Sequence, residues 1–132
     1  MEFGALVPEI YVSDYRKSLD FYTEAIGFKI EYVRTNPLFA LLSLGKAQLM
    51  IQQIEPTDQH TGPLEAPYGR GINFEITVDD VDTLGQRLKD AGQELMLEPT
   101  DFLRKTGETE SSSRELRVLD PDGYYLRFSQ PT

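Results

Sequence analysis

The sequence predicts an α+β fold in which a βαβββ module occurs twice. Three observations lead to this prediction: a repeat offset by half of the 132 residues, two helical stripes that each end at a glycine, and short apolar strands after each stripe. A chain of this length with 39% hydrophobic and 27% charged residues has ordinary globular composition. We therefore expect one domain, residues 1–132, made of repeats at about 1–54 and 71–132 that a linker at 55–70 joins.

The repeat is clearest where residues 9–14, EIYVSD, align with residues 75–80, EITVDD. Each segment reaches a valine and then offers side-chain oxygens that can cap a helix. We expect Ser13 and Asp79 to be the N-caps, because their oxygens can accept hydrogen bonds from the free amides of the first turn. The two segments thus predict the same strand-to-helix junction in both halves.

Both predicted helices carry one apolar stripe at a spacing of about 3.6 residues, which is typical of a helix that lies on a sheet. A glycine supplies the left-handed conformation that ends each helix, Gly27 in the first half and Gly92 in the second. The stripes consist of Tyr15, Leu19, Tyr22 and Ile26, and of Val81, Leu84, Leu88 and Ala91.

Short strands follow each helix and are separated by turn signals such as Asn36-Pro37, Gly45-Lys46 and the run at 120–123. A polar stretch at 99–112 interrupts the second half, and we expect it to be irregular. The predicted strands after the helices span 28–34, 38–44 and 47–54 in the first half, and 94–97, 113–119 and 124–129 in the second.

The chain carries 22 acidic and 13 basic residues, a net charge of −9, and has one histidine and no cysteine. The negative sign argues against a nucleic-acid partner and favours either a cationic or neutral ligand or a simply hydrated acidic surface. Without cysteine, disulfides, thiol nucleophiles and cysteine-based zinc sites are excluded. No apolar run approaches the length of a membrane span and the N-terminus lacks a signal-peptide pattern, so we expect a cytoplasmic protein with no membrane partner.

Strand alternation gives the sheets one polar and aromatic face, opposite the helices. Such a face suits a small-molecule site, because aromatic rings supply area and a few polar groups fix orientation; the alternative is a face that is merely hydrated. Glu9 and Glu75 hold equivalent repeat positions and could share a proton, bind a cation or pair with Arg127. The candidate ligand-binding side chains on this face are Glu9, Tyr11, Gln48, Met50, Asn73, Glu75, Tyr125 and Arg127.

Several short segments resemble the vicinal-oxygen-chelate proteins, a superfamily that includes glyoxalase I, extradiol dioxygenases, fosfomycin-resistance enzymes and bleomycin-resistance proteins. The resemblance covers essentially the whole chain. It implies paired βαβββ modules whose strands form a curved, half-open mixed barrel with the helices on its outer face. The segments that carry it are 6–14, 18–22, 27–28, 71–74, 91–92 and 120–124.

The metal-dependent members of this superfamily place His and Glu ligands on the first and last strands of each module. Here the resemblance puts Val7 and Asn73 at the two His positions, and Met50 and Arg127 at the two Glu positions. Valine and methionine offer no ligand for a hard cation, and arginine is itself positively charged. We therefore expect no metal, no other cofactor and no catalytic residue, with His60 a solvated linker residue.

The remaining resemblance is to the metal-free bleomycin-resistance branch, whose homodimers sequester a cationic glycopeptide drug between subunits. It implies a metal-independent binding protein that takes a cationic or aromatic small molecule at a dimer interface, with Tyr11, Phe39, Phe102 and Tyr125 available to stack on flat rings. One alternative is a lyase, isomerase or dioxygenase-type enzyme of the same superfamily, which would use carboxylates or an atypical metal site. A second is an interaction module whose cleft is filled by its own side chains.

Overall fold

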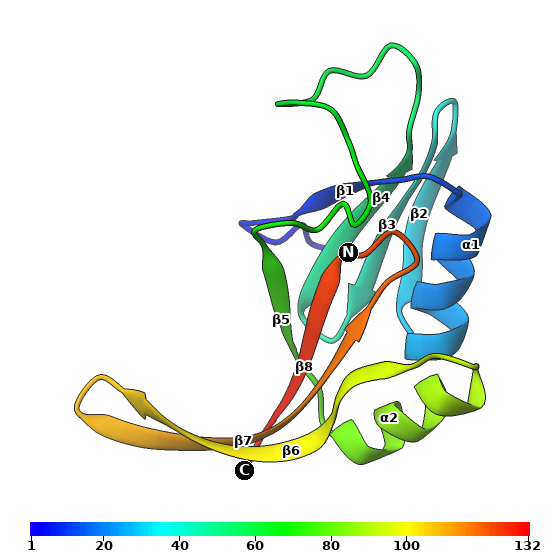
Figure 1. Cartoon of the computed structure of the whole chain (residues 1–132). Helices are drawn as coiled ribbons and strands as arrows, with labels where there is room; N and C mark the ends of the chain where they lie inside the picture. Colours follow the sequence, from blue (N-terminus) through cyan, green and yellow to red (C-terminus); the bar gives the residue numbers. More distant parts are fainter. The chain divides into compact units, whose positions relative to one another are not determined.

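A computed structural model describes residues 1–132, and the chain divides into two compact units, Met1–Tyr68 and Gly69–Thr132 (Figure 1). Each unit contains one four-stranded mixed sheet and one helical segment. The predicted α+β class and the two βαβββ modules are confirmed. None of the helices has the length and hydropathy that a transmembrane span requires.

The first unit has a sheet of strand order β1-β4-β3-β2, in which β1 runs parallel to β4 and the other neighbours are antiparallel. Its helical segment begins as an α-helix and continues as a π-helix that ends at Gly27, which has a φ of 109°. The elements are β1 (Glu9–Val12), α1 (Tyr15–Asp20), η1 (Phe21–Ile26), β2 (Lys29–Thr35), β3 (Leu38–Leu44) and β4 (Ala47–Gln53).

The second unit repeats this topology, with strand order β5-β8-β7-β6 and β5 parallel to β8. The same crossover therefore precedes the same antiparallel meander in both units, as expected for a duplicated module. The elements are β5 (Asn73–Thr77), α2 (Val81–Asp90), β6 (Leu95–Thr106), β7 (Thr109–Leu119) and β8 (Tyr125–Pro131).

Each helix is capped one residue later than the sequence predicts. Asp14, not Ser13, accepts the amide hydrogen of Lys17, and Asp80, not Asp79, accepts that of Thr83. Both aspartates have extended backbone dihedrals, so the helix begins immediately after them. The hydrogen bonds from Thr83 lower the pKa of Asp80, which shows that the cap prefers the ionised carboxylate.

The core of each unit lies between the helix and the apolar face of its sheet. The predicted stripes are buried except for Ala91, which follows the last residue of α2 and is exposed. Burying one such large apolar side chain contributes about 1.5–3 kcal/mol, so the packing of helix on sheet stabilises each unit. The sheet residues that meet the helices are fully buried; they include Ala40, Leu42 and Ile51 in the first unit, and Leu116, Val118, Leu126 and Phe128 in the second.

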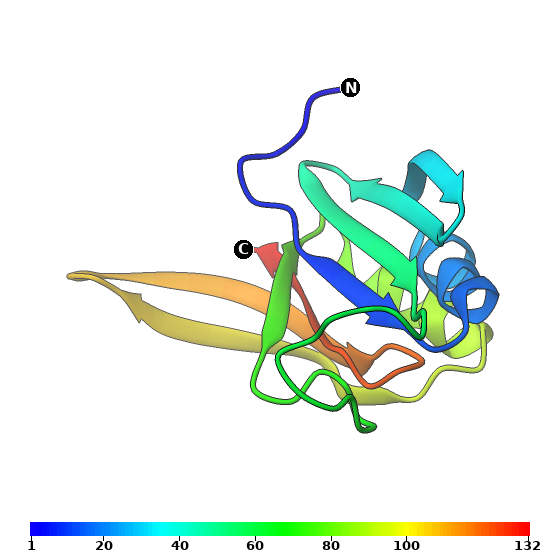
Figure 2. The ribbon, with the colours of Figure 1, turned by 90° about the horizontal axis from the view of Figure 1, so that it is seen from above.

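The expectation of an irregular stretch at 99–112 is wrong, because β6 and β7 extend through it as a long hairpin (Figures 1 and 2). A two-residue turn joins Thr106 to Thr109, and Gly107 supplies its positive φ of 69°. Pairing of β7 with β8 stops at Ser113, so the outer part of the hairpin is a two-stranded ribbon. Pro99 is accommodated because it lies on the edge strand, inside a register shift between Leu97 and Thr100.

Candidate functional site

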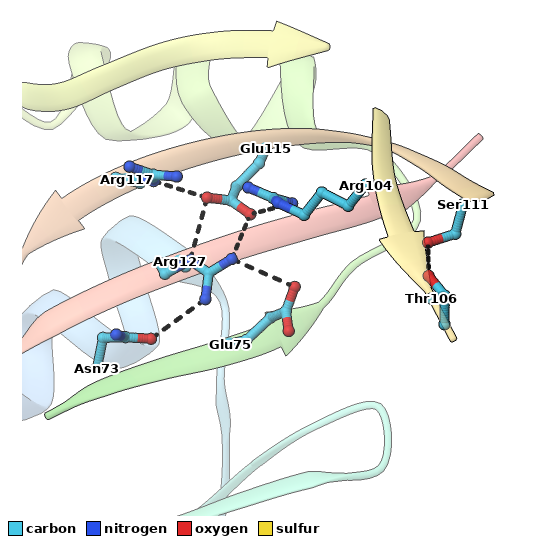
Figure 3. A network of polar contacts seen from close by, with 8 residues as sticks. All are labelled: Asn73, Glu75, Arg104, Thr106, Ser111, Glu115, Arg117 and Arg127. Carbon is cyan, nitrogen blue, oxygen red and sulfur yellow. Dashed lines mark hydrogen bonds and ion pairs between the residues drawn. The ribbon is translucent and has the colours of Figure 1, made fainter. Parts of the chain in front are cut away.

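Three arginines surround one glutamate on the open face of the second unit's sheet. Strand register places Arg117 opposite Arg127, and Glu115 opposite Ser129 on β8 and Thr100 on β6. Paired residues share a sheet face, and the alternate residues of β7 and β8 point toward α2 into the core. We call Arg104, Arg117 and Arg127, gathered around Glu115, the arginine cluster (Figure 3).

The carboxylate of Glu115 is fully buried and accepts a hydrogen bond from every arginine of the cluster. Arg127 binds it through two nitrogens, with Nη2 2.9 Å from Oε1 and Nε 3.1 Å from Oε2. Arg117 donates Nε to Oε2 at 2.6 Å, and Arg104 donates Nη1 to Oε1 at 3.4 Å. Both carboxylate oxygens therefore accept two hydrogen bonds each, and the acid is saturated.

The charge state of Glu115 follows from these contacts. Burial alone would raise its pKa, but the hydrogen bonds from Arg127 and Arg117 outweigh burial and lower the pKa below the ordinary value. The same bonds to Glu115 raise the pKa of Arg117 and of Arg127. At neutral pH the cluster consequently holds three guanidinium cations and one buried carboxylate.

The remaining predicted residues of the second unit lie around this cluster. Arg127 donates Nη1 to Oδ1 of Asn73 at 3.3 Å, and its Nη2 lies 3.7 Å from Oε1 of Glu75. Of the three alternatives left open for Glu75, the contact with Arg127 is the one present. The ring of Phe102 lies under two guanidinium carbons, at 4.3 Å from Arg104 and 5.4 Å from Arg117. These distances fit cation–π contacts.

Tyr125 completes this group, since a hydrogen bond with it contributes to the raised pKa of Arg117. Five predicted side chains, Asn73, Glu75, Phe102, Tyr125 and Arg127, are thus brought onto one face of the second unit.

Sequence reasoning missed Arg104, Glu115 and Arg117. A signal for two of them was present, because Leu116 and Val118 alternate with Glu115 and Arg117 along β7. That alternation places the charged pair on the face opposite the core. Arg104 could not be found in this way, since it lies in the stretch expected to be irregular.

The predicted residues of the first unit also share one sheet face, with Glu9 opposite Met50 on β4 and Tyr11 opposite Gln52. Glu9 is exposed, while Tyr11 meets the ring of His60 edge-on, with centroids 4.5 Å apart. Burial, followed by the charges of nearby acids, raises the pKa of Tyr11. His60 lies in the linker, as expected, and is half-buried in this contact.

Two predicted residues of the first unit are already engaged by the protein itself. Gln48 accepts a hydrogen bond from the Gly4 amide and donates one to the Glu2 carbonyl at 2.6 Å. Phe39 is only 1% exposed, and the guanidinium carbon of Arg34 lies 4.6 Å from its ring centroid. These contacts tie both side chains to neighbouring segments of the same unit.

The residues that the resemblance places at four metal-ligand positions do not fit a divalent cation. Val7 and Met50 present no oxygen or nitrogen side-chain donor, and Arg127 presents a cation bound to Glu115. Asn73 offers one amide oxygen, which Arg127 occupies. No group of three or more His, Cys, Asp or Glu side chains that could bind a metal is present.

A hollow of about 340 Å³ lies on the other side of the second unit, between α2 and β6. Its charged groups are paired with one another, Lys89 with Glu98 at 2.6 Å and Arg114 with Asp82 at 3.0 Å. Such mutually satisfied surface pairs do not point to a ligand. The arginine cluster is the better candidate site.

Comparisons with known proteins give one family and a set of similar folds. Residues 4–128 match the sequence model of the Glyoxalase/Bleomycin resistance protein/Dioxygenase superfamily. A search of curated proteins gives no match.

Among solved structures, TioX from Micromonospora sp. ML1 is similar with a TM-score of 0.74 and 19% identity, over 98% of this chain and 100% of that one. Virulence protein STM3117 from Salmonella typhimurium has a TM-score of 0.68 and 21% identity over 100% of both chains. A glyoxalase/bleomycin resistance protein/dioxygenase from Alicyclobacillus acidocaldarius has a TM-score of 0.65 and 20% identity, over 97% of this chain and 91% of that one. At these identities the likeness is one of fold, and function must be argued from the site.

Proposed function

The chain belongs to the Glyoxalase/Bleomycin resistance protein/Dioxygenase superfamily, and from this premise we propose that it is a metal-independent binding protein for a small aromatic molecule. The observation that carries the proposal is Arg127, which stands where the resemblance expects a ligand glutamate and is bound through two nitrogens to buried Glu115. A guanidinium held in this way cannot coordinate a cation, and it blocks the position for other ligands.

Aromatic rings beside the arginines support the second half of the proposal. Phe102 and Tyr125 are half-buried on the open face and adjoin the guanidinium groups of Arg104 and Arg117. This combination of aromatic rings and guanidinium groups suits a ligand with a flat ring, because both guanidinium planes and aromatic faces stack on such a ring. The ligand would be held by stacking and hydrogen bonds, without chemistry.

The proposal also places the chain with the metal-free, bleomycin-resistance-like branch and extends to its assembly as a homodimer. Sedimentation velocity of the purified protein tests the assembly, with a monomer at micromolar concentration contradicting it. Metal-free bleomycin tests the branch by calorimetry. No heat at tens of micromolar would remove the drug from the proposal and leave the aromatic class to be tested separately.

The test of the function has two arms. Elemental analysis of protein purified without chelator should find no stoichiometric Zn, Ni, Mn or Fe. Calorimetric titration with 2-naphthalenemethanol, a neutral flat ring, should show binding that Phe102→Ala abolishes and that Phe39→Leu, in the first unit, leaves intact. Stoichiometric metal would overturn the proposal in favour of an enzyme of the superfamily. Absence of binding at millimolar concentration by this alcohol, by the corresponding acid 2-naphthoate and by 2-naphthylmethylammonium would remove the aromatic ligand class.

A further inference from the structure

We propose that the arginine cluster recognises the acidic group of an aromatic carboxylate, which Arg104 and Arg117 bind while Phe102 contacts the ring. The inference rests on the proposed function and names the chemical class of its ligand. It concerns one face of the second unit and the residues that the strand register gathers there.

The local charge around the arginine cluster favours an anionic ligand. The second unit has eight basic and thirteen acidic residues, yet the open face around the cluster reverses this excess. Three guanidinium groups meet two carboxylates there, and only Glu115 is fully buried against them. Glu75 is half exposed and touches Arg127 alone, at 3.7 Å. The face therefore carries a positive charge that the protein does not neutralise, inside a molecule whose net charge is −9.

More arginines surround Glu115 than its single charge requires. One bidentate guanidinium already neutralises the charge of a carboxylate, and Arg127 supplies that pair to Glu115. The bonds from Arg104 and Arg117 fill the remaining acceptor sites but bring two further cations. Like charges directly opposite each other across two strands are destabilising, yet Arg117 lies opposite Arg127. A cluster that served only to neutralise Glu115 would need neither Arg104 nor Arg117.

Arg104 and Arg117 keep N–H donors that Glu115 does not use. Glu115 takes one N–H from Arg104 and one from Arg117, and Tyr125 engages Arg117 as well, while each guanidinium carries five N–H groups. The side chains of Arg104 and Arg117 are 39% and 28% exposed, so their outer nitrogens can be reached from solvent. The planar fork of a guanidinium matches the two oxygens of a carboxylate. Glu115 thus acts as a positioning residue that holds the arginines in place for an external acid.

The ring of Phe102 lies beside the two guanidinium groups that would bind the acidic group of the ligand. Phe102 lies under both arginines, with its ring centroid 4.3 Å and 5.4 Å from their guanidinium carbons. A ligand that pairs with these guanidinium groups therefore brings its own body against Phe102. A flat aromatic acid satisfies both neighbours at once, whereas an inorganic anion leaves the ring unused.

The experiment compares three probes that share the naphthalene ring system and differ in charge. They are 2-naphthoate, 2-naphthalenemethanol and 2-naphthylmethylammonium, each titrated by calorimetry. We expect naphthoate to bind about tenfold tighter than the alcohol, because hydrogen bonds to charged groups are the stronger ones, and the ammonium to bind weakest. Arg104→Gln and Arg117→Gln should each bring naphthoate close to the alcohol, because naphthoate loses a charged hydrogen bond whereas the alcohol loses only part of its stacking surface. Arg104→Lys keeps the charge without the fork and should retain part of the preference.

The control is Arg87→Gln, which makes the same change of charge on the exposed face of α2 and should leave the preference for naphthoate intact. Unfolding midpoints of all variants establish that each is folded during the titrations. Equal or tighter binding of the ammonium, or an unchanged preference in both Arg104→Gln and Arg117→Gln, would overturn this inference while alcohol binding upholds the proposed function. Failure of all three probes to bind at millimolar concentration would overturn both.

Discussion

Glu115 shows how one buried charge can organise a surface. Its carboxylate is 0% exposed, and removing it from water costs several kcal/mol that only its four hydrogen bonds offset. A buried ion pair of this kind is not a large source of stability compared with an apolar replacement, but breaking it is costly. Glu115 therefore fixes the geometry of the arginines more than it strengthens the fold.

The first prediction concerns this carboxylate. Glu115→Gln should lower the free energy of unfolding by about 3 kcal/mol, the lower end for a broken buried pair, because the partly exposed arginines can regain water. Urea unfolding at neutral pH, followed by circular dichroism, measures the loss. Glu108→Gln makes the same change of charge at an exposed turn and should be nearly neutral. A loss no larger than that of the control would contradict the role given to Glu115.

A pH dependence follows from the same residue. The folded-state pKa of Glu115 lies below its ordinary value of 4.5, so its charge stabilises the fold above that pH. The contribution is lost as the pH falls below 4.5 and through the folded-state pKa. The difference in unfolding free energy between the natural protein and Glu115→Gln should therefore stay constant from neutral pH to about pH 5 and then shrink. A difference that grows on acidification would contradict this assignment.

At the scale of elements, the sequence predicts what local pattern determines. The strand at Leu38–Leu44 has the predicted bounds, and both helices end before the predicted glycines, because apolar periodicity and positive φ are properties of short segments. The N-caps differ by one residue, since Ser13-Asp14 and Asp79-Asp80 each offer two adjacent oxygens that could cap. Choosing between them requires the backbone dihedrals.

The hairpin of β6 and β7 and the arginine cluster could not be predicted in this way. Residues 99–112 contain proline, glycine and several charged residues, which are depleted in strands. Their strand conformation depends on the pairing of β6 with β7. Arg104, Glu115 and Arg127 come from three strands, so only the register brings them together. Composition also misleads here, because a net charge of −9 hides a local positive face.

The outer ribbon of this hairpin should be the least stable part of the second unit. Beyond Ser113 it consists of only two strands, and isolated two-stranded ribbons have marginal stability in water. Gly107→Ala should strain the turn, where φ is 69°, and should speed amide hydrogen exchange in residues 101–112 without changing exchange in β8. Gly62→Ala has open space and no positive φ, so it is the matched control. Equal acceleration in β8 would show that the ribbon unfolds together with the whole unit.

For the whole molecule, duplication explains both what the two units share and where they differ. The same strand order and helix placement recur, and acidic residues exceed basic ones in each unit. On the corresponding sheet face of the first unit, Glu9 lies opposite Met50 and Tyr11 lies on the same face, without a cluster of cations. One module thus supplies two chemically different faces on a single topology, and ligand class is set by side chains rather than by fold.

The net charge gives the last prediction, which concerns rates. An anion approaching a molecule of charge −9 is repelled at long range, and the Debye length falls from about 30 Å at 0.01 M salt to about 8 Å at 0.15 M. The arginine contacts act over a few ångströms and are screened much less. The association rate of 2-naphthoate, followed by stopped-flow fluorescence, should therefore rise with salt over this range, while that of 2-naphthylmethylammonium falls and that of the neutral alcohol stays constant. A naphthoate rate that falls steeply with salt would mean that the field of the arginine cluster, rather than the acidic surface, guides the ligand from a distance.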